Sequence, residues 1–148
     1  MIRSAATAAL YFVLTVALTP ISFGIVQFRL SEALVLLPFL FPETTVGLVV
    51  GCAFANIMSP FGLLDIAVGS IVTGIAGYLT SKIKNIWLAP LPPILLNAFI
   101  LPVVWGIVDS SGGLYIINVL SLLVSQSVVI YAGGVPLTKA IGKLHFTR

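Results

Sequence analysis

Long apolar runs, separated by short polar or proline-rich connections, fill nearly all of the 148-residue chain. A helix needs about 20 apolar residues to cross the hydrocarbon core of a bilayer, and its connection adds a few more. The pattern therefore predicts a bundle of membrane-crossing helices. The runs cover residues 4–19, 31–41, 44–58, 63–81, 86–108 and 114–141.

The run at 31–41 is short for a crossing. As a separate α-helix of roughly 11 to 14 residues it would reach about 20 Å, against about 30 Å for the bilayer core. It also contains Pro38, which can kink a helix. If it forms one broken crossing with the next run, the chain has five spans rather than six. Pro42-Glu43 resembles a helix start, and this favours two helices and six spans.

The distribution of basic residues fits either topology. Lys and Arg collect on the cytoplasmic side of membrane proteins. With six spans and a cytoplasmic N-terminus, only Arg29 of the seven Lys and Arg lies outside; with five spans and an external N-terminus, only Arg3 does. Arg3 and the apolar stretch after it also resemble a signal peptide. Further apolar runs follow, so we expect an uncleaved first span and, with six spans, both termini in the cytoplasm.

Composition excludes whole classes of protein. Apolar residues make up 59% of the chain and charged residues 7%, and the mean hydropathy is +1.21. Soluble domains carry roughly 25% charge, and disorder requires low hydrophobicity with high charge, so neither class fits. The single cysteine, Cys52, excludes an internal disulfide. We expect an all-α integral membrane protein, with one transmembrane domain over residues 1–148 and six transmembrane helices in a compact bundle (alternatively five spans).

Catalytic and nucleotide-binding motifs are absent from the sequence. The only histidine, His145, lies in the basic tail, and there is no HExxH motif, nucleophile elbow or P-loop. We therefore expect no enzyme, metal or cofactor, and no ATP hydrolysis by the chain itself. The net charge of +3 includes no basic cluster interleaved with aromatic residues, so we expect no nucleic-acid partner.

Several polar residues fall at one level, near the outer ends of the six predicted spans. An ionisable group costs roughly 2.5 to 3.5 kcal/mol at the centre of a span. Glu32 and Asp65 stand near the starts of their apolar runs, and both starts lie at the outer face. With neighbouring aromatic residues they predict a substrate pocket open to the outside. Its candidate residues are Gln27, Arg29, Glu32, Asn56, Phe61, Asp65, Asn97 and Trp105.

Each candidate also has an ordinary explanation. The acids can complement helix dipoles, and Arg29 can pair with Glu32 three residues on. Asn97 and Gln126 can hydrogen-bond between helices, and Trp105 can sit in an interfacial belt. The pocket hypothesis depends on the convergence of several such residues in a chain with only four Asp or Glu.

Small residues recur at a spacing of four along three predicted helices. Such stripes let helix backbones approach closely in lipid. We expect the two glycine-containing stripes to pack within the chain, whereas a short alanine patch in the first run fits either packing or docking of another protein. The stripes are Gly47, Gly51, Ala55 and Ser59, then Gly69, Thr73, Gly77 and Ser81, and the patch is Ala5 and Ala9.

A set of segments over residues 4–140 carries a family resemblance. The segments are TPISFG, QFRLSEALVLLP, PE at 42–43, ANIMSPFGLLD ending at Asp65, and LAPLPPILLNA at 88–98. Together they resemble the QueT-type family, the substrate-binding subunits of energy-coupling factor transporters for queuosine precursors. QFRxSEAL and SPFGLLD are specific in combination, whereas each alone is weak.

The resemblance implies a six-helix subunit of the bacterial cell membrane that binds its substrate from outside. Such subunits join a coupling membrane protein and two ATPases, and are thought to topple in the bilayer to carry the substrate inward. An AxxxA patch on their first helix contacts the coupling protein, and Ala5 and Ala9 match it.

The implied substrate is a 7-deazaguanine base. A carboxylate, from Glu32 or Asp65, can accept the ring N–H and the exocyclic amine together, and the other acid can neutralise the aminomethyl cation of one precursor. Aromatic faces stack on such bases. Candidates for the carbonyl are Gln27, Asn56 and Asn97, and for stacking Phe28, Phe61 and Trp105. The alternatives are another planar heterocyclic vitamin in the same transporter class, and a membrane scaffold protein without a ligand.

Overall fold

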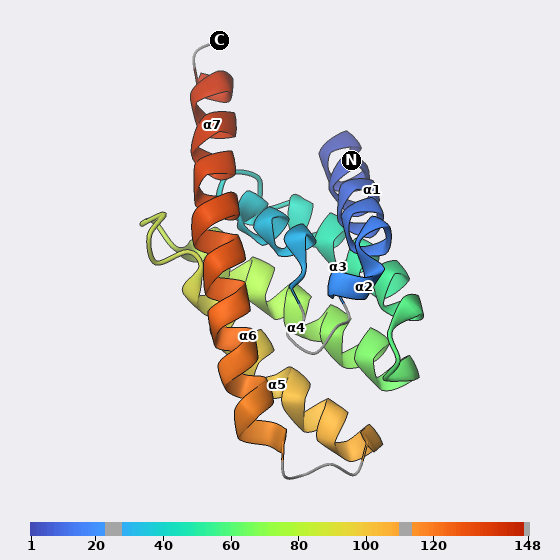
Figure 1. Cartoon of the computed structure of the whole chain (residues 1–148). Coiled ribbons are helices and arrows are strands. Elements are labelled where there is room, and N and C mark those ends of the chain that lie inside the picture. Colours follow the sequence, from blue (N-terminus) through green and yellow to red (C-terminus); the bar gives the residue numbers. More distant parts are fainter. Residues whose placement is uncertain (23–27, 110–113, 147–148) are drawn as a thin grey trace.

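The computed structural model describes residues 1–22, 28–109 and 114–146, and these are helical over most of their length, with no strand among them (Figure 1). This confirms the expected all-α class. The first half comprises α1 (Ile2–Ala17), α2 (Thr19–Ser22), the 3₁₀ helix η1 (Leu30–Phe39), α3 (Thr44–Ala55) and the 3₁₀ turn η2 (Asn56–Met58). The second half comprises α4 (Gly62–Lys82), α5 (Leu91–Asp109), α6 (Tyr115–Val129), the π-helical turn η4 (Ile130–Gly134) and α7 (Val135–Phe146).

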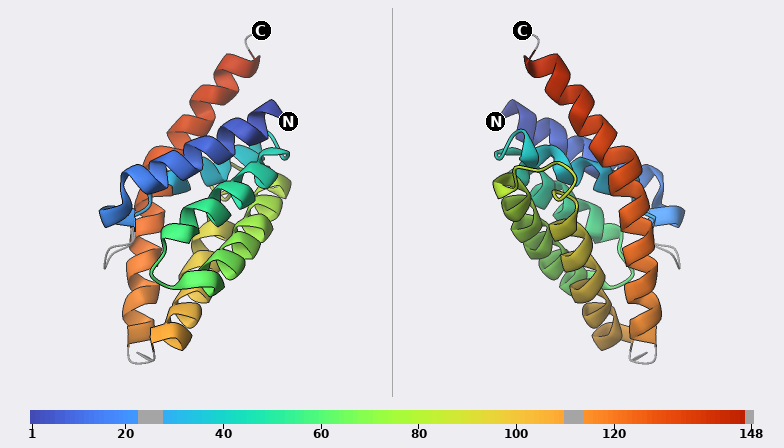
Figure 2. Two further views of the ribbon diagram at one scale, coloured as in Figure 1. Left: turned by 90° about the vertical axis from the view of Figure 1, so that its right-hand side faces the viewer. Right: turned by 90° about the vertical axis from the view of Figure 1, so that its left-hand side faces the viewer.

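Helices that follow one another in sequence also pack against one another. α1 lies on α3, α3 on α4, α4 on α5 and α5 on α6, while η1 packs against α1, α3, α4 and η4. Both termini lie at one end of the bundle, and the end of α5 and the start of α6 lie at the other (Figures 1 and 2). The central position of η1 brings its side chains into contact with both halves of the chain.

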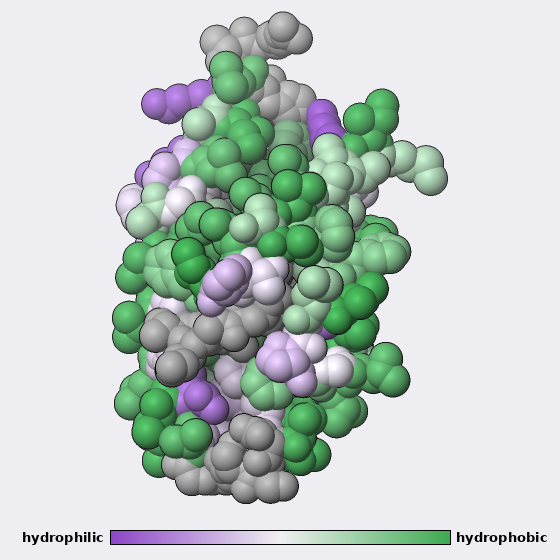
Figure 3. All heavy atoms as spheres, turned by 45° about the vertical axis from the view of Figure 1, so that its right-hand side comes forward, coloured by the Kyte–Doolittle hydropathy of each residue, from purple (hydrophilic) through white to green (hydrophobic). Residues whose placement is uncertain are grey.

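Three helices in the described part of the chain are long and apolar enough to cross a membrane: Gly62–Lys82, Leu91–Val108 and Tyr115–Leu144. Three further apolar helices are shorter, at Ile2–Ala17, Leu30–Phe39 and Thr44–Met58. Together these six correspond to the six apolar runs of the sequence. Apolar side chains dominate the face in Figure 3, which fits a membrane protein whose outer surface meets lipid.

The short run at 31–41 forms a 3₁₀ helix rather than an α-helix. A 3₁₀ helix rises about 2.0 Å per residue, so its ten residues reach about 20 Å. Nearly every side chain from Ser31 to Pro38 is buried, because η1 is surrounded by other helices. A helix that is apolar all round is typical of such a position.

Separate helices before and after Pro42-Glu43 are confirmed, because α3 begins at Thr44 with Glu43 as its N-cap. The expected role of the glycine stripes is confirmed as well. A Cβ on Gly51 would lie 2.8 Å from the carbonyl oxygen of Ala8, and one on Gly77 would lie 2.8 Å from Thr45 Cγ2. These glycines therefore let α1 and α4 pack closely on α3.

Candidate functional site

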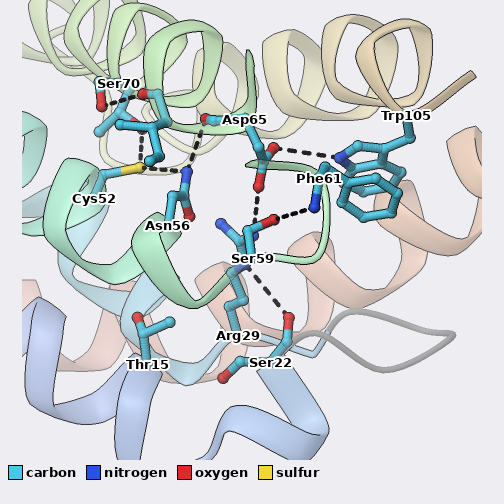
Figure 4. A network of polar contacts seen from close by, with 12 residues as sticks. Thr15, Ser22, Arg29, Cys52, Asn56, Ser59, Phe61, Asp65, Ser70 and Trp105 are labelled. Carbon is cyan, nitrogen blue, oxygen red and sulfur yellow. Dashed lines mark hydrogen bonds and ion pairs between the residues drawn. The ribbon is translucent and has the colours of Figure 1, made fainter. Parts of the chain in front are cut away.

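Polar residues from three separate parts of the chain are buried in the same region of the bundle, and Figure 4 shows Arg29, Asn56 and Asp65 among them. Arg29 immediately precedes η1 and Glu32 lies in its first turn, Asn56 begins η2, and Asp65 lies in the first turn of α4. Their exposed fractions are 5%, 4%, 0% and 0%. Buried charges need partners or a ligand, so each contact of this cluster bears on its purpose.

Asp65 is held from three directions. Trp105 Nε1 donates a hydrogen bond of 3.3 Å to Asp65 Oδ1, and Arg29 Nη2 lies 3.8 Å from Asp65 Oδ2. Asn56 Nδ2 donates a 3.0 Å hydrogen bond to the backbone carbonyl of Asp65. Arg29 thus forms an ion pair with Asp65, which is far away in the sequence. The sequence analysis had considered only a local pair of Arg29 with Glu32.

Glu32 is held from α1. The hydroxyl of Tyr11 donates a 2.8 Å hydrogen bond to Glu32 Oε1, and Thr15 Oγ1, one turn further along α1, lies 2.7 Å from Ser31 Oγ. Tyr11 is completely buried, and the sequence analysis missed it because it stands in an apolar run. Two features of the sequence could have indicated a polar contact here. A tyrosine inside an apolar helix needs a hydrogen-bond partner for its hydroxyl, and Thr15 follows Tyr11 at a spacing of four, on the same helix face.

A tight turn places an aromatic pair beside Asp65. Gly62 has a φ of 66°, a left-handed conformation that glycine adopts without strain, and Ser59 Oγ accepts a 3.2 Å hydrogen bond from the backbone N–H of Phe61. The rings of Phe61 and Trp105 stack with centroids 5.2 Å apart and an interplanar angle of 19°. Trp105 is only 5% exposed, so it lies inside the bundle rather than in an interfacial belt.

Three acceptor atoms of the cluster lack a hydrogen bond from the described residues, although one of them, Asp65 Oδ2, lies 3.8 Å from Arg29 Nη2. Glu32 Oε2, Asn56 Oδ1 and Asp65 Oδ2 are buried and accept no hydrogen bond from any residue that the structure describes. In each residue another side-chain atom is already bonded to the protein. Buried acceptors are usually satisfied, so these atoms are candidates for contact with a ligand that donates hydrogen bonds.

The remaining candidates lie in other surroundings. Asn97 Nδ2 donates a 3.2 Å hydrogen bond to Gln126 Oε1. This pair links α5 to α6, as expected if the two residues hydrogen-bond between helices rather than contact a substrate. Phe28 lines an apolar groove with residues of η1 and α6. Gln27 lies outside the described residues.

The alanine patch lies on the outside of α1. Ala5 and Ala9 are exposed, whereas Ala8 faces Gly51 of α3. Beside the patch, α1 and α3 border a wholly apolar groove of about 280 Å³. Its lining residues are Ala8, Ala9, Phe12, Val50, Gly51 and Phe54.

Apolar helices around a buried cluster of polar side chains fit a membrane protein of the transporter class. A family model described as QueT transporter matches residues 1–143. The chain belongs to the QueT transporter family, which confirms the resemblance seen in its motifs. The family model describes its members as transporters.

A curated relative carries a more specific name. The chain is 36% identical over 75 residues to "Queuosine precursor transporter QueT" of Lactococcus lactis subsp. cremoris (strain MG1363). The aligned region covers 49% of this chain and 44% of that relative. No solved structure matches the chain.

Proposed function

We propose that the chain is the substrate-binding membrane subunit of an energy-coupling factor importer that captures a queuosine precursor with a 7-deazaguanine base. The name of the Lactococcus relative supports the substrate class. The observation that carries the proposal is the set of buried acceptor atoms on Glu32, Asn56 and Asp65 that accept no hydrogen bond from a described residue. A deazaguanine presents several N–H donors, and hydrogen bonds from such donors to carboxylates are strong.

The aromatic pair completes the recognition of the base. Trp105 both stacks on Phe61 and donates to Asp65, so a flat ring on this aromatic surface would hold its N–H edge near the acceptors. Base–aromatic stacking is worth roughly 1 to 3 kcal/mol per base. A deazaguanine is flat and has a donor-rich edge, so it matches both the aromatic surface and the acceptors.

We further infer a single transmembrane domain of six spans in the bacterial cell membrane, with both termini in the cytoplasm. Asp65 and Phe61 belong to the start of α4, whereas Lys82 lies in its last turn. Because basic residues favour the cytoplasmic side, the cluster then faces the outer half of the membrane. The six spans include the short helices α1, η1 and α3, which pack against the longer helices.

The chain has no P-loop, so transport driven by ATP requires partners that hydrolyse it. We propose a coupling transmembrane protein with two ATPase subunits, docked on Ala5 and Ala9. The opposite face of α1 is occupied by α3 and η1, and the exposed alanines leave room for a partner helix to approach closely.

Calorimetry on the purified protein in detergent tests the proposed function. Queuine and its precursors should bind saturably without ATP, whereas riboflavin, thiamine and folate should not. If one of these vitamins binds instead, the substrate is a vitamin and the transporter class stays the same. Absence of saturable binding by every compound would contradict the proposal and favour a scaffold protein.

A further inference from the structure

Three exposed lysines lie where the end of α4 and the connector to α5 meet α7 (Figure 1). Lys82 is in the last turn of α4, Lys84 is in the connector at residues 83–90, and Lys139 is on α7. Lys139 Nζ lies 4.1 Å from the centroid of the Trp87 ring, which also belongs to the connector. We refer to these three lysines and Trp87 as the lysine patch.

Hydrogen bonds hold the connector in a defined position. The hydroxyl of Tyr131, in η4, donates a 2.9 Å hydrogen bond to the backbone carbonyl of Trp87. The backbone N–H of Trp87 donates a 3.0 Å hydrogen bond to Asn85 Oδ1. Thr80 Oγ1 donates a 3.3 Å hydrogen bond to the backbone carbonyl of Ala89. A ligand of the patch therefore meets a preorganised surface, which lowers the entropy cost of binding.

The acidic residues of the chain lie elsewhere. Glu32 and Asp65 are buried, and Glu43 forms an ion pair of 3.2 Å with Arg3. Asp109 ends α5, at the end of the bundle away from both termini (Figure 2). Each lysine ammonium carries a positive charge, so the patch presents an electropositive surface that favours an anion.

Exposed apolar side chains adjoin these lysines. The Tyr78 ring is exposed one turn before Lys82, whose Nζ lies 5.2 Å from the ring centroid. Trp87, Leu88 and Leu91 are each at least 40% exposed. Tyr and Trp are typical of the membrane–water interface, where lysine stems lie along apolar surface and their ammonium groups reach the headgroups. One lipid can match both features, whereas an acidic protein segment would match the charges alone.

We propose that the lysine patch is a binding site for an anionic phospholipid. The lipid phosphate accepts charge-assisted hydrogen bonds from Lys84 and Lys139, and the acyl chains lie along Leu88 and Leu91. Asp65 and Lys82 are near opposite ends of α4, about 25 Å apart at 1.5 Å per residue. The lipid site is therefore separate from the buried polar cluster and does not depend on which substrate that cluster binds.

Fluorescence quenching by brominated lipids tests the site, because bromine on an acyl chain quenches a tryptophan beside it. The purified chain is reconstituted in vesicles of phosphatidylcholine with a rising fraction of phosphatidylglycerol, and the bromine is placed on one lipid or the other. Trp87 is exposed and reports on the patch, whereas Trp105 is buried and its residual signal is measured in Trp87→Phe. The wild type should prefer phosphatidylglycerol at Trp87 by about fivefold or more, which is the contribution expected of one lysine near an anionic headgroup.

Substitutions assign the preference to particular lysines. Lys139→Gln should lower it, and Lys84→Gln combined with Lys139→Gln should bring it within about twofold of unity. Arg3→Gln is the control matched to Lys139→Gln, since it also removes one exposed positive charge but belongs to the pair with Glu43, and it should keep the wild-type preference. High salt should reduce the wild-type preference, because it screens exposed charges.

Three results would overturn the proposal. Equal quenching by the two lipids in the wild type would reject the lipid site, and this measurement needs no variant. An unchanged preference in the double variant, with its helical circular dichroism retained, would reject the role of the two lysines. If the wild type shows no lipid preference and the double variant binds other transporter subunits less tightly, the partner of the patch is an acidic protein surface instead.

Discussion

Replacing Tyr11 with phenylalanine tests the link between α1 and the site. The ring is completely buried and phenylalanine fills nearly the same volume, so packing is retained and only the hydroxyl is lost. The lost contact is the 2.8 Å hydrogen bond to Glu32 Oε1. Hydrogen bonds to charged groups contribute about 1.5 to 3 kcal/mol, and a buried carboxylate deprived of its donor carries a desolvation penalty of similar size. We therefore expect Tyr11→Phe to lower the free energy of unfolding by about 1.5 to 3 kcal/mol.

The assay is equilibrium unfolding in mixed micelles, with and without a saturating 7-deazaguanine ligand. The loss should be largest without ligand, because an N–H donor of a bound base can replace the hydroxyl that Glu32 has lost. Tyr78→Phe is the matched control, since Tyr78 is 60% exposed on α4, and it should change stability by less than about 0.5 kcal/mol. Equal stability of Tyr11→Phe and wild type without ligand would refute the inferred importance of this hydrogen bond.

Three further substitutions test the site, the docking face and the packing. Asp65→Asn should weaken deazaguanine binding about tenfold or more, because a charge-assisted acceptor becomes neutral; unchanged affinity in calorimetry would remove Asp65 from the site. Ala9→Trp should leave binding intact but stop uptake by cells that supply the partners, whereas Val124→Trp on α6 should permit it; normal uptake in both would reject the docking face. Gly51→Ala should cost about 1 to 3 kcal/mol by forcing α1 away from α3, while Gly106→Ala, where an added Cβ meets no atom within 4 Å, should be tolerated in the same unfolding assay.

Much of the fold follows from patterns that are local in sequence. Hydrophobic runs located the helices, and proline and an acid at 42–43 correctly indicated the start of α3 at Thr44. The glycine spacing of four correctly indicated close packing, because it depends only on helix geometry. The 3₁₀ winding of η1 was not predictable in this way, since it belongs to a segment enclosed by other helices.

The site was only partly predictable, for a related reason. The scarcity of charge drew attention to Arg29, Glu32 and Asp65, and the structure buries all three. Which acid pairs with Arg29 depends on how η1 packs against α4, and no local spacing contains that information. Tyr11 was missed because its sequence neighbours are apolar, although its hydroxyl is the recorded hydrogen-bond donor to Glu32.

Equilibrium binding of radiolabelled 7-aminomethyl-7-deazaguanine to the purified chain alone, without ATP or partners, tests the central claim most directly. The wild type should bind the base saturably, and a variant carrying both Glu32→Gln and Asp65→Asn should show no saturable binding while remaining folded. The contradictory result is wild-type protein that binds no labelled base, or a folded double variant that binds it as tightly as the wild type.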